Sequence, residues 1–185
     1  STRKTERLVE AMGIVGISKS QVSEMAKTLD KVVADFRNRS LEDLEYPIVW
    51  LDAMQIRTRE VGQVVKVATV IATAVSSEGH REIIGVDVFT SEDEAAWTDF
   101  LRGLKARGLN GVKLVISDAN KGLVNAVGAV LPGTMWQRCR THFMTNLLAR
   151  VPKAAQGLVA SLVRSIFNQL DAEQVWKQHA SVVDQ

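Results

Sequence analysis

The sequence predicts a mixed α/β fold, a mixed sheet with flanking helices, an N-terminal helical arm and a C-terminal helical segment. Three observations predict it. Residues 46–89 show the two-residue periodicity of β-strands. Residues 112–117 form an almost wholly apolar run between two helical patterns. Both ends of the chain carry apolar residues at the three- and four-residue steps of α-helices. The predicted units are an arm over 1–40, a core over 46–142 and a helical segment over 143–185.

Length and composition exclude several classes of protein. A chain of 185 residues with 46% hydrophobic and 24% charged residues fits one sizeable domain with an appendage. The longest apolar stretch, around Val67–Val75, is too short to cross a bilayer, and residues 1–10 lack a signal-peptide core, so we expect a cytoplasmic protein. One cysteine excludes an internal disulfide and, with three histidines, argues against a structural zinc site.

The net charge of +2 is unevenly distributed. It is +3 over residues 1–40, −5 over residues 41–118 and +4 over residues 119–185. Basic ends favour contact with a polyanion, and an acidic middle favours bound cations. The alternative is that these charges only cover solvated faces.

The arm is predicted to contain two helices. The first covers Arg3–Met12, and the second begins after Ser18, which forms a capping box with Gln21 and precedes an apolar stripe that ends at Phe36. This pattern is typical of a helix-turn-helix arm, in which polar residues at the start of the second helix contact DNA. The residues placed there are Lys19, Ser20 and Gln21. Two amphipathic helices that only pack together are the alternative.

Three strands follow, over Ile48–Thr58, Gln63–Val75 and Arg81–Phe89, and short turns predict an antiparallel meander. A helix comes next, with a capping box made by Ser91 and Glu94.

A buried parallel strand over Val112–Ser117, a helix over Asn120–Val130 and a fifth strand over Thr134–Arg138 complete the core. This order of elements describes the ribonuclease H-like arrangement, in which the first and fourth strands lie side by side.

Two aspartates occupy corresponding places on those two strands. Asp52 lies in the middle of the first strand and Asp118 follows the fourth, so we expect the two carboxylates to face each other. Their repulsion would be relieved by a divalent metal with a preference for oxygen ligands. Two such ions about 4 Å apart activate a nucleophile and stabilise a leaving oxygen at a phosphodiester.

Each aspartate has a structural alternative. Asp118 could be the N-cap of the next helix. Asp52 is expected to be a buried charge without a partner, which is costly and therefore favours a functional role. Glu82 and Asp87 are expected on the solvent face, with Asp87 as an alternative metal ligand.

A second candidate site follows the fifth strand. Cys139 and His142 have C-x-x-H spacing, but two ligands without a second pair make a weak zinc site. With Arg138, Arg140 and Trp136 they form a patch that suits a phosphate and a displaced base. The alternative is a packed Trp and Cys beside exposed arginines.

Several linked motifs together resemble bacterial insertion-sequence transposases of the Mutator type. They occur in the same order as in that family and cover essentially the whole chain. The motifs are Gly16–Ser23, Tyr46–Ala53, Ser91–Leu101, Leu114–Ala119 and Trp136–Leu148.

The resemblance implies a ribonuclease H-like DDE transposase, in which three acids hold two Mg²⁺ or Mn²⁺ ions and DNA strands are cleaved and transferred. Asp52 and Asp118 would be the first two acids, and Cys139 with His142 the element that helps handle DNA. The implied partners are double-stranded DNA, as transposon terminal inverted repeats and target DNA, and further copies in a homo-oligomer.

The third acid of the family is a Glu beyond a long helical insertion. Glu173 lies in the stretch that resembles the insertion itself, so it is not assigned that place. We therefore expect this chain to be a fragment that is inactive in isolation. The alternatives are a truncated remnant that only binds DNA or oligomerises, and a different ribonuclease H-like nuclease or resolvase.

Overall fold

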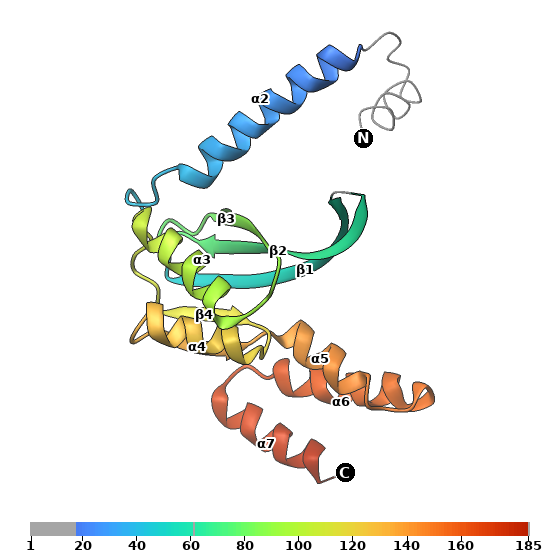
Figure 1. Ribbon diagram of the computed structural model, residues 1–185. Coiled ribbons are helices and arrows are strands. Elements are labelled where there is room, and N and C mark those ends of the chain that lie inside the picture. Colours follow the sequence, from blue (N-terminus) through green and yellow to red (C-terminus); the bar gives the residue numbers. More distant parts are fainter. Residues whose placement is uncertain (1–17, 61, 185) are drawn as a thin grey trace.

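The computed structural model of the chain describes residues 18–60 and 62–184 (Figure 1). The helix predicted over Arg3–Met12 lies outside the described residues. None of the helices in the described part is long and apolar enough to cross a membrane.

Five strands form one mixed sheet in the order β3-β2-β1-β4-β5. They are β1 (Ile48–Glu60), β2 (Gln63–Val75), β3 (Arg81–Phe89), β4 (Leu114–Ser117) and β5 (Met135–Arg138). Strands β1, β2 and β3 pair with one another in antiparallel fashion, whereas β4 runs parallel to both β1 and β5. This is the ribonuclease H-like arrangement that the order of elements predicts.

Helices α3 (Glu94–Ala106) and α4 (Lys121–Val130) pack together beside the sheet (Figure 1). Their apolar stripes and alternate strand residues form a single core that includes Val49, Leu51 and Val115. The predicted cap of α3 is wrong. Asp93 is the N-cap, because its side chain accepts a hydrogen bond from the amide of Ala96 at 3.0 Å.

Residues of β1 alternate between two environments. Val49 and Leu51 are buried in the core, whereas Trp50 is half-buried and Asp52 and Met54 are exposed. Strand geometry sends successive side chains to opposite faces, so the second set lies on the side away from the core.

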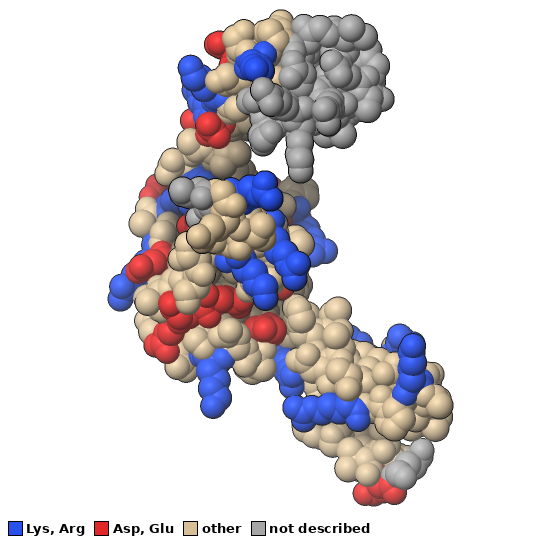
Figure 2. Space-filling view, turned by 45° about the vertical axis from the view of Figure 1, so that its right-hand side comes forward, with Lys and Arg blue, Asp and Glu red and all other residues tan. Residues whose placement is uncertain are grey.

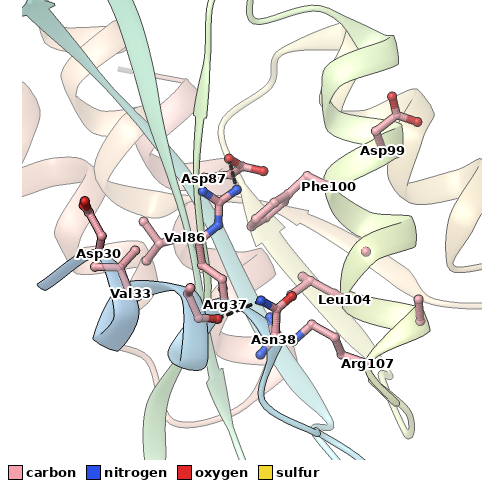
Figure 3. A pocket seen from close by; sticks show the side chains of 14 residues that line it. Asp30, Val33, Arg37, Asn38, Val86, Asp87, Asp99, Phe100, Leu104 and Arg107 are labelled. Carbon is pink, nitrogen blue, oxygen red and sulfur yellow. Dashed lines mark hydrogen bonds and ion pairs between the residues drawn. The ribbon is translucent and has the colours of Figure 1, made fainter. Parts of the chain in front are cut away.

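Helix α2 (Lys19–Asn38) extends away from the sheet and has no buried residue (Figure 1). The predicted capping box is confirmed, since Ser18 and Gln21 bond reciprocally. The C-terminal end of the helix is held to β3 by an ion pair between Arg37 and Asp87, beside a hollow of about 680 Å³ (Figure 3).

The remaining chain is helical, and α6 and α7 pack against each other. Its elements are α5 (Arg140–Leu148), a short 3₁₀ helix η1 (Lys153–Ala155), α6 (Gln156–Phe167) and α7 (Ala172–Val183).

Candidate active site

The register between β1 and β4 aligns the two predicted aspartates. Trp50 pairs with Ile116, and the next two positions along each strand lead to Asp52 and to Asp118. Because both strands run in the same direction, Asp52, which lies within β1, is level with Asp118, which directly follows β4, at the end of the β1–β4 pairing.

Asp52 is not buried, which corrects the expectation from the sequence. Its side chain is 67% exposed, and its Oδ1 accepts a hydrogen bond from the amide of Ala53 at 3.0 Å. The reason is that Asp52 lies on the side of β1 away from the core, where His142 of α5 approaches it but leaves the carboxylate largely hydrated, so it carries little desolvation cost. Exposure leaves its oxygens accessible to a ligand.

Asp118 is not the N-cap of α4, so the structural alternative for this residue is not observed. Asn120 caps the helix by accepting from the amide of Leu123 at 3.1 Å, and Asp118 instead accepts from the amide of Asn120 at 3.0 Å. The second oxygen of Asp118 has no hydrogen bond among the described residues and can accept one from a ligand.

Hydrogen bonds from β5 support the end of β4 beside Asp118. Ser117 is almost completely buried, and its hydroxyl oxygen accepts from the indole Nε1 of Trp136 at 2.9 Å. The amide of Cys139 donates to the carbonyl of Ser117 at 2.6 Å. These contacts bring the start of α5 against the acid-bearing end of the sheet.

Cys139 and His142 therefore lie beside Asp52. All three line a hollow of about 250 Å³ on the uncovered side of the sheet. His142 Nε2 is 3.8 Å from Asp52 Oδ1, and the Cys139 thiol is free and half-buried. The C-x-x-H spacing places one turn of α5 between the two residues, so both reach the same hollow.

Two contributors to this region escaped the sequence analysis. Arg81 of β3 lines the same hollow, with its guanidinium 5.5 Å from the centre of the Trp50 ring. Glu92, in the turn before α3, accepts a long hydrogen bond of 3.4 Å from the Gln55 side chain. Burial raises the pKa of Glu92 above its ordinary value, and the charges of Asp118 and Asp52 raise it further.

Only tertiary structure reveals these two residues as neighbours of the acids. Arg81 lies at the start of a strand, where charged residues are common, so its position in the sequence does not indicate a functional site. Glu92 belongs to the acidic run 92–94, and the signal that could have singled it out is its position at the end of an edge strand, before the helix cap at Asp93.

The two predicted arginines stack on aromatic rings. The guanidinium of Arg138 lies 5.4 Å from the centre of the Phe143 ring, and that of Arg140 lies 4.0 Å from the Phe167 ring of α6. Arg140 shares a groove of about 540 Å³ between α5 and α6 with Arg164. A stacked guanidinium keeps its N–H edge available for a phosphate.

Other predicted residues lie elsewhere. Lys19, Ser20 and Gln21 are exposed at the free end of α2, remote from the sheet (Figure 1), and Gln21 is engaged in the capping box. Asp87 is paired with Arg37 on the other side of the core (Figure 3), so it does not contribute to the hollow of Asp52.

The donor chemistry of Asp52 and Asp118 fits a hard divalent cation. Neither carboxylate forms an ion pair with Lys or Arg among the described residues. Mg²⁺ is commonly bound by one or two carboxylates while it keeps several waters. Within residues 18–60 and 62–184, no group of three His, Cys, Asp or Glu side chains is arranged to hold a metal.

Strand order and strand direction place the chain in the ribonuclease H-like class of folds, with one aspartate within β1 and the other directly after β4. The chain belongs to the Mutator family of transposases, whose family model matches residues 1–185. It is 52% identical to the transposase for insertion sequence element IS1081 of Mycobacterium tuberculosis over 184 residues, 100% of this chain.

A second relative is the transposase for insertion sequence element IS256 in transposon Tn4001 of Staphylococcus aureus, 39% identical over 171 residues, 92% of this chain. The matched part is 44% of the length of each relative. Among solved structures, the Drosophila P element transposase strand transfer complex aligns with a TM-score of 0.39 at 14% identity, over 64% of this chain and 32% of that chain.

Proposed function

We propose that this chain is the part of a DNA transposase that carries the first two acids of the active site. The intact protein would cleave DNA at transposon ends and transfer the freed strands to target DNA. The observation that carries this proposal is the level placement of Asp52 and Asp118 on adjacent parallel strands in a Mutator-family chain.

The reaction consists of two displacements at phosphorus. In the first, a water oxygen bonds to phosphorus and the P–O3′ bond breaks, which leaves a 3′-hydroxyl and a 5′-phosphate. In the second, that 3′-hydroxyl oxygen bonds to a phosphorus of target DNA while the P–O3′ bond of the target breaks. No covalent bond to the enzyme is needed.

Asp52 and Asp118 would hold the divalent cation through their carboxylate oxygens. When bound, Mg²⁺ or Mn²⁺ supplies Lewis-acid polarisation of the phosphodiester and lowers the pKa of the attacking water. The side chains around Asp52 would bind and orient the DNA. Arg81 offers charged donors in the same hollow, and His142 offers a ring nitrogen 3.8 Å from Asp52.

Metal binding tests this assignment without requiring activity. We expect Mn²⁺ titrated into the 185-residue chain, followed by electron paramagnetic resonance, to bind at least about tenfold more weakly to Asp52→Asn/Asp118→Asn, because loss of even outer-shell support costs about tenfold or more. Asp99→Asn is the matched control, since Asp99 is exposed on α3 and does not line the hollow of Asp52. Unchanged Mn²⁺ binding in the double variant would contradict the site.

A second candidate function is DNA binding or oligomerisation without chemistry. It is favoured because the described residues bring no third acid into a metal cluster with the aspartates. Duplex binding that needs no metal and persists in Asp52→Asn/Asp118→Asn, together with absence of Mn²⁺ binding to the parent chain, would support this candidate over the first.

A further inference from the structure

The hairpin of β1 and β2 continues well beyond the sheet. Strand β4 pairs with β1 only over Ile48–Trp50, and β3 pairs with β2 only over Ala68–Val75. Residues 56–60 and 63–67 therefore pair only with each other, and they form a two-stranded ribbon that projects from the molecule (Figure 1). An isolated two-stranded ribbon is marginally stable in water, so its length needs an explanation.

Three cations gather on one face of this ribbon. Arg57 is paired directly with Lys66, and Arg59 is paired with Val64. Paired residues share a face and side chains two positions apart share a face, so Arg57, Arg59 and Lys66 lie together. All three residues are exposed.

This charge arrangement is unfavourable for the free protein. Like charges directly opposite each other destabilise a strand pair. Among the side chains that the structure describes, no Asp or Glu forms an ion pair with any of the three cations. Figure 2, in which this side of the molecule comes forward, shows Lys and Arg side chains across its middle and acidic side chains gathered below them. Within the described side chains the cluster lacks a counter-charge, and a polyanion would supply one.

The shape of the ribbon suits duplex DNA. The major groove is wide enough for a two-stranded β-ribbon, and basic side chains then reach the phosphates that border it. On the face of the three cations the ribbon also exposes an apolar side chain, since Val64, the residue paired with Arg59, is 62% exposed.

We propose that the β1–β2 ribbon is a duplex-DNA-binding arm in which Arg57, Arg59 and Lys66 contact backbone phosphates. This inference rests on the proposed function, which makes DNA the substrate. Arg57 and Arg59 follow Asp52 on β1 by five and seven residues, which is about 17–23 Å at about 3.3 Å per residue, and these odd spacings place them on the opposite face of the strand from Asp52.

Fluorescence anisotropy with a labelled duplex, in EDTA and over a series of salt concentrations, tests the proposal. We expect Arg57→Gln/Lys66→Gln to weaken binding about tenfold and to reduce the slope of log K against log salt by about 1.8, since each lost phosphate contact removes about 0.9. The control Arg102→Gln/Lys177→Gln removes the same charge from exposed residues of α3 and α7 and should leave the slope near that of the parent.

Thermal unfolding of the same variants separates DNA contact from a structural role. Removal of opposed like charges should leave the melting temperature of Arg57→Gln/Lys66→Gln unchanged or raised while DNA binding falls. A lowered melting temperature accompanied by an unchanged salt slope would overturn the proposal. A changed sedimentation coefficient with unchanged DNA binding would also overturn it, because the ribbon would then contact a second copy of the chain.

The outcome is distinguishable from failure of the proposed function. Duplex binding is measured in EDTA, so its result does not depend on whether Asp52 and Asp118 hold a metal. If those aspartate variants lose Mn²⁺ but the ribbon variants retain full duplex binding, only the ribbon proposal fails. If Mn²⁺ binding never depends on the aspartates but the ribbon variants weaken duplex binding, only the active-site assignment fails.

Discussion

His142 lies with its Nε2 3.8 Å from Asp52 Oδ1, although the first residue belongs to α5 and the second to β1. The contact depends on the parallel pairing of β1, β4 and β5, which brings the chain after β5 back to the end of β1. The C-x-x-H motif of the sequence therefore lies beside Asp52, and both Cys139 and His142 line the same hollow.

The bond between Trp136 and Ser117 should contribute to the stability of this end of the sheet. We expect Trp136→Phe to lower the free energy of unfolding by about 1 kcal/mol or more, because the buried Ser117 hydroxyl loses its indole donor. Urea unfolding measures the change. Trp176→Phe is the control, since Trp176 is 69% exposed on α7, and an equal loss in both variants would contradict the role of the bond.

The packing of α4 against the start of α3 depends on Gly122. A Cβ at this position would lie 2.9 Å from the backbone nitrogen of Glu94, so Gly122→Ala should destabilise the protein by about 1–3 kcal/mol. Gly128 is exposed in the same helix, and a Cβ added there would meet no described atom within 4 Å, so Gly128→Ala should stabilise the protein by about 0.5–1 kcal/mol. Opposite shifts in the urea midpoint are the expected result, and shifts of the same sign would contradict this packing.

Glu92 should make stability depend on pH in a defined direction. Burial raises the pKa of Glu92, followed by the charge of Asp118, so its contribution is most favourable below the ordinary pKa of a Glu and is lost as the pH rises through the raised pKa. Glu92→Gln should therefore stabilise the metal-free protein at pH 7, by about 0.5 kcal/mol given its partial exposure, and the gain should vanish near pH 4.

Urea unfolding of Glu92→Gln at both pH values provides the measurement. Glu24→Gln on the exposed face of α2 is the matched control and should show no such pH-dependent gain. A variant at position 92 that is less stable than the parent at pH 7 would show that the carboxylate is stabilised by its surroundings instead.

The stack of Arg140 on Phe167 should couple α5 to α6. A double-mutant cycle with Arg140→Gln and Phe167→Leu, followed by urea unfolding, should give a coupling energy of about 0.5–1 kcal/mol. The pair Arg150→Gln and Phe167→Leu is the control, because the guanidinium over this ring is that of Arg140. A coupling energy near zero for both pairs would mean that the stack adds nothing to packing.

Much of the fold could be predicted from local patterns. The β-branched period of 63–75 defines β2 with its observed bounds, and the capping box of Ser18 and Gln21 marks the start of α2. Such features depend on neighbours within a few residues, so they can be predicted from the sequence alone. The sequence could not decide between Ser91 and Asp93 as the N-cap of α3, because both residues have suitable side chains and lie within one turn of each other.

The site was only partly predictable for a related reason. The sequence identified Asp52 and Asp118, but it predicted a buried Asp52 because alternation along β1 does not reveal which face the helices cover. Arg81 and Glu92 were missed because they are far from the acids in the sequence. Arg81 is brought near Asp52 by the pairing of β3 and β1 with β2, and Glu92 by the position of the turn before α3.

The sequence by itself determined the order and type of the elements, the two acids on the first and fourth strands and the family of the chain, because these depend on local periodicity and linked motifs. Only the tertiary structure decided that Asp52 faces solvent, that His142 and Arg81 share its hollow and that three cations lie together on a free ribbon. Those relations depend on strand register and on which sheet face is covered, and both are set by contacts between residues far apart in the chain.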